Sequence, residues 1–460
     1  MVAVSLIVIS ALSALQDTTA QSSVPRSDER EHSILAATRA QAMVALVSNS
    51  IRTRFGVELS TRGSSREADL ATATLPPDDL VVPIRSPAER ASAEPDPTDA
   101  PVALEPIVVP NVGGPAPTPT TSPPPLTPGL FAASDPRVGN DFILISRARL
   151  VSLPMSGPAW EQLKSVADEN PGTPNLSDLD QVNNVHVLAQ ALVFARTGNP
   201  TYRASVLAQL KAVVGTEGAR TLELGRKGAA YVLAADFIDL AGLDPSFDNG
   251  TFRPWLRSLL TVQLDGRSLQ QTHEERANNW GTHAGATRAA IAAYLHDGAE
   301  LARTAQVFQG WLGNRAAYAG FSFGDMTWQP NPSAAVPVLP VGAVMGGVSV
   351  DGALPEEMRR GDAFEWPPAP TEYPWGALEG ATLQAEILHR SGYDAFNWSD
   401  RALLRAVRFL FEQAQWRPAG NDQWVFWVID YRYGTGYRAG PPVPYGKNFG
   451  FSDWLYGPAG

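Results

Sequence analysis

The chain has 460 residues, a formal net charge of -11 and no cysteine. This length suffices for one large domain with tails, or for two to three domains of average size. An acidic chain lacks the basic footprint typical of nucleic-acid binders, so we expect no nucleic-acid partner. Without cysteine there are no disulfide bonds, thiolate nucleophiles or cysteine zinc sites. The six histidines form no HExxH motif, and we therefore expect neither a metal nor another cofactor.

The first residues, MVAVSLIVISALSAL, form an apolar run that ends shortly before Ala20. The run has the length of a signal-peptide core and is too short to span a bilayer. We therefore predict a signal peptide at 1–20, export to the periplasm, the cell surface or the medium, and no stable membrane insertion. A wrongly assigned start or a short membrane anchor are the alternatives, because a basic segment before the run is missing.

Residues 21–134 are predicted to be a disordered, Pro-rich linker or stalk. Positions 76–128 alone hold 16 of the 39 prolines. Such a stretch sustains neither helix nor sheet ladders. All 12 tryptophans lie from Trp160 onward, and we place the folded domain at 135–460.

Within this domain the hydrophobic pattern is helical. Apolar residues recur with helical spacing over 185–192, and the helix is predicted to stop at Thr197-Gly198. Asn199 then offers an N-cap and Pro200 a first helical position for the next helix, over 202–214. Similar helix–Gly–helix joints recur at Asp297-Gly298 and Ser391-Gly392. These joints predict a mainly α fold of antiparallel helix pairs, in the form of an incomplete (α/α) toroid or barrel.

Two segments leave their structure open. Residues 339–350 are rich in glycine and valine and fit a short strand or a loop, and the aromatic residues 424–437 fit a helix or a strand.

The segment Glu275–Gly285 reads ERANNWGTHAG and precedes a helical pattern. If the helix already includes Asn279, then His283 lies four residues further on the same face. An amide and an imidazole would then converge on one point. The alternative is that Asn278 or Asn279 caps the helix and that His283 packs in the core.

A second segment, LPEEMRRG at 354–361, is followed by Tyr373-Pro374-Trp375 at a predicted helix start. It combines Arg359 and Arg360 with several aromatic side chains and a tyrosine. The alternative is a surface loop with solvated charges, in which tryptophans belong to the core.

Taken in order, these segments resemble the alginate-lyase-like polysaccharide lyases. The shared features are Asn-Asn-aromatic at a helix start, the pattern DGxLPxExxRG and a tyrosine before AL; they cover roughly residues 140–455. The resemblance implies an incomplete toroid that cuts next to a uronic acid and leaves an unsaturated sugar. It also implies that Asn279 neutralises the substrate carboxylate, that Arg360 is the arginine of the RG motif and that Tyr373 is the catalytic tyrosine. Trp280 stands where this family often has histidine.

The reaction explains these residue types. Removing the C5 proton beside a carboxylate builds negative charge that amide and guanidinium groups can stabilise. Histidine suits a base near neutral pH, which is the role predicted for His283. A tyrosine is suited to protonate the leaving oxygen, and beside an arginine it could also act as the base. The residues expected to bind the acidic polysaccharide are Asn278, Asn183, Arg226, Arg359, Trp280 and Trp375.

Two other functions stay open at this point. An inverting glycoside hydrolase on the same fold would need two carboxylic acids, for which Glu274, Glu275, Glu356, Glu357, Asp362 and Glu372 are available. A non-catalytic glycan-binding protein on a stalk is the other possibility. The particular uronic acid, endo or exo action and the oligomeric state do not follow from the sequence.

Overall fold

The computed structural model describes residues 141–438 and 440–458. The predicted signal peptide and the whole of the predicted linker lie outside these residues. The helices of the first half are α4 (Arg147–Ser152), α5 (Pro158–Asp168), α6 (Asn183–Thr197), α7 (Pro200–Val213), α8 (Thr221–Phe237), α9 (Leu240–Leu243), α10 (Pro245–Phe247), the π-helix η2 (Asp248–Phe252) and α11 (Arg253–Thr261).

The second half continues with α12 (Leu269–Glu275), α13 (Asn279–Leu295), α14 (Gly298–Trp311), η3 (Pro332–Ala334), β1 (Val344–Met345), β2 (Val348–Ser349), α15 (Pro355–Met358), α16 (Tyr373–Arg390), α17 (Trp398–Arg408), η4 (Phe409–Gln413), η5 (Gly420–Gln423), α18 (Trp424–Tyr433) and α19 (Ser452–Leu455). The predicted mainly α class is confirmed. Closure of the helices into a toroid stays a prediction.

The predicted helix joint at 197–200 is confirmed. Helix α6 ends at Gly198, which has a φ of 73° that favours glycine, and its N–H donates to the Phe194 carbonyl. The Asn199 side chain accepts from the Thr201 N–H and so caps α7, which begins at Pro200. Of the two segments left open, 424–433 is helical, and 344–349 forms a two-stranded antiparallel hairpin.

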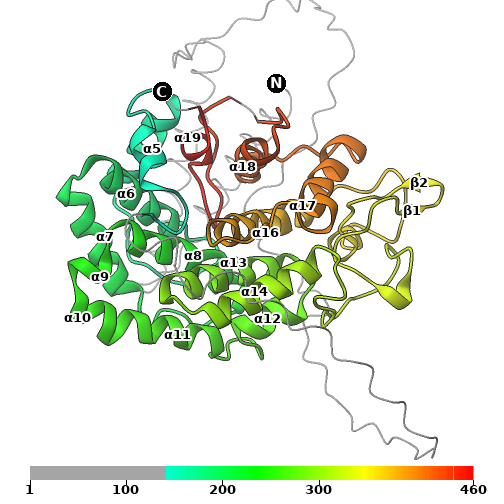
Figure 1. Cartoon of the computed structure of the whole chain (residues 1–460), viewed down its shortest axis with the longest axis horizontal. Coiled ribbons are helices and arrows are strands. Elements are labelled where there is room, and N and C mark those ends of the chain that lie inside the picture. The colour runs from blue at the N-terminus through cyan, green and yellow to red at the C-terminus, as the bar shows by residue number, and fades with distance from the viewer. Residues whose placement is uncertain (1–140, 439, 459–460) are drawn as a thin grey trace, which may run out of the picture. The chain divides into compact units, whose positions relative to one another are not determined.

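Helices α8, α13 and α16 lie side by side, with α13 between the other two, at the centre of the described helices (Figure 1). In each pair of neighbouring helices, residues later in one helix contact residues later in the other, which means that the helices are parallel. Asn279 lies near Gly376, and His283 near Gly380 one turn later. On the other side of α13, Thr287 Oγ1 accepts from the Ala229 N–H of α8 at 2.8 Å.

Small residues set this close packing. A Cβ placed on Gly380 would stand 2.5 Å from the His283 backbone nitrogen, and one on Gly225 of α8 would stand 2.9 Å from the Ala284 nitrogen. The backbones of three helices therefore nearly touch. Polar side chains near the first turns of α13 and α16 are consequently held in a fixed mutual position.

No helix among the described residues combines the length and the apolarity needed to cross a membrane.

Candidate active site

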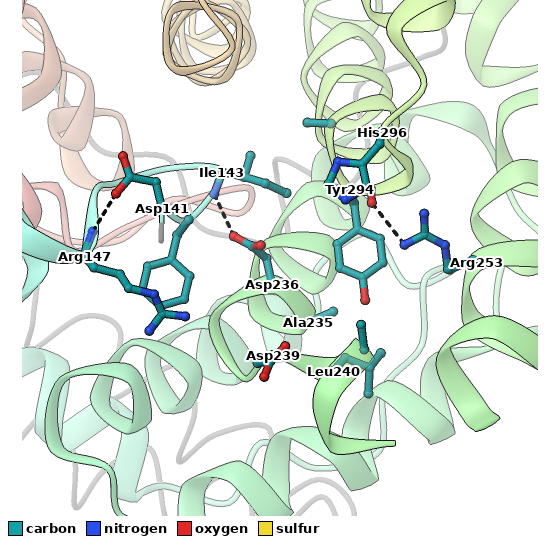
Figure 2. Close-up of a pocket in the computed structure, with 13 residues that line it drawn as sticks. Asp141, Ile143, Arg147, Ala235, Asp236, Asp239, Leu240, Arg253, Tyr294 and His296 are labelled. Carbon is teal, nitrogen blue, oxygen red and sulfur yellow. Dashed lines mark hydrogen bonds between the residues drawn. The ribbon is translucent and has the colours of Figure 1, made fainter. Parts of the chain in front are cut away.

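A cavity among the described residues lies away from the predicted site residues. It has a volume of about 240 Å³, and its lining includes Asp236 and Tyr294 from the last turns of α8 and α13, together with Asp239, Arg253 and His296 (Figure 2). Tyr294 follows Asn279 by fifteen helical residues, which is about 22 Å along the helix axis. Many of its polar groups are already bound, since Asp236 accepts from the Ile143 N–H at 2.7 Å and Arg253 donates to the carbonyls of Tyr294 and Leu295.

The predicted asparagine pair begins α13. Asn278 is the N-cap, and its side chain accepts from the Trp280 N–H at 3.1 Å. Asn279 is the first helical residue, is 4% exposed, and has its Nδ2 beside Gly376 of α16. Among the described residues, its Oδ1 has no hydrogen-bond partner. Asn278 therefore has a structural role, while the amide of Asn279 retains bonding capacity.

A buried carboxyl group lies behind Asn279. Glu357 of α15 accepts a hydrogen bond from the Asn279 N–H, while its Oε2 has no partner among the described residues. Burial raises the pKa of Glu357 to about 8, although the nearby Arg360 guanidinium opposes the shift. The group is therefore mainly protonated at neutral pH and couples the RG segment to the start of α13.

Arg360 and Tyr373 form a stacked pair. The Arg360 guanidinium carbon lies 3.8 Å from the centroid of the Tyr373 ring, within the range of a cation–π contact. Both side chains are half-buried. Tyr373 begins α16, one turn before Gly376, which adjoins Asn279. The structure thus brings three of the four predicted catalytic residues to the facing starts of α13 and α16.

His283 lies one turn deeper on α13. It is completely buried, and neither ring nitrogen has a hydrogen-bond partner among the described residues. Burial holds the pKa of His283 well below its ordinary value, and the charge of Arg226 lowers it further. The imidazole is therefore neutral. This placement agrees with the core-packing alternative considered above.

Of the predicted substrate-binding residues, Arg226 of α8 best supplies the positive charge that the predicted site requires. It is half-buried, and within residues 141–438 and 440–458 its side chain forms no ion pair or hydrogen bond. Its charge acts on His283 and on Glu379 of α16. Glu379 accepts from the Trp424 indole N–H at 2.9 Å. Burial raises the pKa of Glu379 to about 7, against the opposing effects of Trp424, Arg226 and Lys447.

The other predicted binding residues have partners within the protein. Asn183 accepts from the Tyr231 hydroxyl and donates to the carbonyls of residues 171 and 172. Arg359 pairs with Glu356 at 2.5 Å. Trp375 is 3% exposed, and Trp280 lies against Arg276, whose guanidinium carbon is 4.4 Å from the indole centroid. The structure does not place these side chains against a shared opening, and their substrate contacts stay predictions.

Sequence reasoning missed two carboxyl groups. Glu357 is the glutamate of the DGxLPxExxRG pattern and was considered only for hydrolysis. Glu379 lies in an otherwise apolar and small-residue helix, where a charged residue six positions after Tyr373 was an available signal. No three His, Asp or Glu side chains in the described part of the chain gather as a metal site. The expectation of a metal-free reaction stays a prediction.

Replacing Glu357 tests the assignment of its proton. A carboxyl group whose pKa is raised on folding binds its proton more tightly in the native state, so stability is lost as pH rises from about 4.5 to 8. Glu357→Gln keeps the acceptor for the Asn279 N–H and removes the ionisation. We expect this variant to match the wild type at pH 5 and to be more stable by about 2–4 kcal/mol at pH 8.

Urea midpoints at pH 5 and pH 8 measure this effect. The exposed Glu365→Gln variant serves as the control and should change neither midpoint. Equal midpoint shifts for Glu357→Gln at both pH values would show that folding does not raise the pKa of Glu357.

Comparison with protein families agrees with the sequence motifs. Residues 197–326 match the family model described as "Alginate lyase". This stretch contains α8, α13 and the asparagine pair. Over this stretch, 130 of the 460 residues, the match supports the predicted resemblance to an alginate-lyase-like family of polysaccharide lyases. Searches of curated proteins and of solved structures returned no match.

Proposed function

We propose that the protein cleaves a polymer that contains uronic acids, such as an alginate-like or glucuronan-like chain, by β-elimination. The observation that carries this proposal is that Arg360 stacks on Tyr373 at the start of α16, one turn before Gly376, which adjoins the Asn279 amide at the start of α13. The family match to alginate lyase supports a polysaccharide substrate. The signal-peptide-like start supports action outside the cytoplasm.

The two positively polarised groups act on the substrate carboxylate. The Asn279 amide donates to one carboxylate oxygen, and the Arg360 guanidinium balances the charge that grows as the C5 proton leaves. Glu357 supports this arrangement because it holds the Asn279 N–H and, when protonated, adds no negative charge beside the substrate. These groups bind the developing enolate-like state more tightly than the ground state, and this difference lowers the barrier.

Tyr373 is proposed as both base and acid. It is half-exposed and stacked under a cation, whereas His283 is completely buried beneath Gly380. Tyr373 starts the cycle as the phenolate, after its own proton has passed to solvent water. The phenolate takes the C5 proton of the uronate, and the phenol so formed donates that proton to the O4 leaving oxygen, which regenerates the phenolate. The C4–O4 bond breaks as the C4–C5 double bond forms, so atoms and charge balance. His283 then acts as a neutral core residue that positions α13.

The amide of Asn279 provides a direct test. Asn279→Ala removes a donor aimed at the developing charge, and we expect kcat/KM to fall by about 10²–10³-fold. The helix should persist because its cap is Asn278. Initial rates on the preferred polymer measure the effect. A rate within a few-fold of wild type, in a folded variant, would remove Asn279 from the mechanism.

The reaction class is tested with a panel of acidic polysaccharides. Elimination yields a conjugated C4–C5 double bond, so alginate, glucuronan or a glycosaminoglycan that serves as substrate should give products that absorb ultraviolet light. Reducing ends without that absorbance would identify a hydrolase instead. Hydrolysis is the second candidate because Glu357 and Glu379 are buried carboxyl groups with raised pKa values, as a general acid requires.

A further inference from the structure

A second cation lies next to Arg226 in the same helix and is not used by the reaction described above. Lys227 of α8 is 1% exposed. In the described part of the chain its Nζ has no hydrogen-bond acceptor and no ion-pair partner. A buried ammonium group without an acceptor is costly to fold, because it loses its water and gains nothing in return.

None of the acidic groups around Lys227 forms an ion pair with its ammonium among the described residues. Its charge is influenced by Asp178, Glu223 and Asp180. Asp180 pairs with Lys447 at 2.9 Å, and Glu223 pairs with Arg220 through Oε1, while its buried Oε2 has no hydrogen-bond partner among the described residues. Asp178 accepts from the backbone N–H groups of residues 180 and 181 in its own turn. The protein thus leaves this ammonium without a counter-ion in contact.

Two asparagines with unmet bonding capacity belong to the same region. Asn184, at the start of α6, donates to the Lys447 carbonyl at 2.8 Å, while its Oδ1 has no partner among the described residues. Asn448 is 1% exposed, and neither atom of its amide has a partner there. Its Oδ1 would lie 3.1 Å from a Cβ on Gly446. Asn184 is therefore hydrogen-bonded to the loop of residues 445–448, and Asn448 belongs to that loop.

This loop connects the region to the proposed elimination site. A Cβ on Gly446 would also stand 2.6 Å from Glu379 Oε1, and the charge of Lys447 acts on both Glu379 and Lys227. The unused polar groups accordingly extend across the neighbouring helices α16, α13, α8 and α6 (Figure 1). Lys447 is partly exposed and Asp180 exposed, and the charges of both act on Lys227.

We propose that Lys227, with Asn448 and Asn184, forms a second carboxylate subsite that binds another uronate of the same polymer under the loop of residues 445–448. This inference rests on the proposed function. A polymer of uronic acids presents a carboxylate on each sugar, whereas Asn279 and Arg360 bind only the carboxylate of the sugar that loses its C5 proton. The ammonium and the Asn448 amide donate to that carboxylate, and the free amide oxygens accept from sugar hydroxyls. Burial lowers the pKa of Lys227 only to about 8, so the group is mainly charged at pH 7.

The test measures binding separately from turnover. Calorimetry at pH 7 uses the Tyr373→Phe protein with mannuronate and glucuronate tetrasaccharides, each in native and carboxyl-reduced form. We expect the added Lys227→Met change to weaken the better-bound native tetrasaccharide by about 10–100-fold, as for a charge-assisted hydrogen bond. The carboxyl-reduced form should bind equally with and without the change. Lys211→Met, at a partly exposed lysine paired with Asp244, is the matched control and should alter neither affinity.

Thermal stability provides a readout that separates binding from a structural role. Because methionine fills a similar volume without a charge, Lys227→Met should raise Tm by about 3 °C or more. A lower Tm, an equal loss of affinity for native and reduced tetrasaccharides, or failure of the Tyr373→Phe parent to bind either native sugar would overturn the subsite. If the wild type forms ultraviolet-absorbing products but binding does not depend on Lys227, only the subsite proposal is wrong. If binding depends on Lys227 but no such products form, only the proposed elimination is wrong.

Discussion

Tyr373→Phe is expected to lower kcat by about 10³–10⁴-fold and to leave the fold intact. The substitution removes one hydroxyl group and keeps the ring on which the Arg360 guanidinium stacks at 3.8 Å. In the proposed reaction that hydroxyl both takes the C5 proton and protonates O4. A loss of this size is therefore larger than that expected from removing a single charge-stabilising donor such as Asn279.

The rate of ultraviolet-absorbing product formation measures this prediction, with circular dichroism and Tm as checks on folding. Tyr431→Phe is the matched control, since Tyr431 is 48% exposed on α18, away from the starts of α13 and α16. Comparing His283→Leu with Tyr373→Phe distinguishes between the two candidate bases. If His283→Leu abolishes turnover in a folded protein while Tyr373→Phe retains most of it, the imidazole is the base.

Gly380→Ala is expected to have the largest effect on stability. The added methyl group would stand 2.5 Å from the His283 nitrogen and 2.5 Å from the Thr282 carbonyl carbon, both of them backbone atoms that cannot rotate away. Helices α13 and α16 would have to separate. We expect a loss of about 3 kcal/mol in the free energy of unfolding and a further loss of activity, because the separation moves Asn279 away from Tyr373.

Gly376→Ala, one turn earlier on the same helix, is the control. Its added methyl group would meet only the Asn279 Nδ2, at an ordinary contact distance of 3.7 Å. Alanine also favours helix over glycine by roughly 1 kcal/mol, so this variant should be as stable as the wild type or more so. Urea denaturation compares the two variants. Equal midpoints for both would show that the helices are not in close backbone contact at Gly380.

Local signals in the sequence predicted much of the helical framework. Gly198, Asn199 and Pro200 end one helix and begin the next through backbone preferences that act within a few residues. Asn278 and Asn279 likewise mark the start of α13. Caps and helix periodicity are local, and for this reason they can be recognised without knowledge of the fold.

The side-chain environments were less predictable because they depend on distant segments. The spacing of Asn279 and His283 indicated a shared helix face, but the burial of His283 results from glycines on α8 and α16. Trp375 was considered for stacking on sugars, yet it packs on Phe426 with ring centroids 5.5 Å apart. Glu379 meets Trp424 from 45 residues further along the chain. Periodicity alone does not identify such partners.

The parallel direction of α13 and α16 has an electrostatic consequence. Each helix carries about half a positive charge at its N-terminus, from backbone N–H groups that lack intrahelical partners. Asn279 begins one helix and Tyr373 the other, and Gly376 places these two ends side by side. Their dipoles therefore add at the same place, as in other anion sites built on helix ends. The backbone thus supplies a local positive potential, suited to the acidic sugar of the proposed reaction, on a protein whose overall charge is -11.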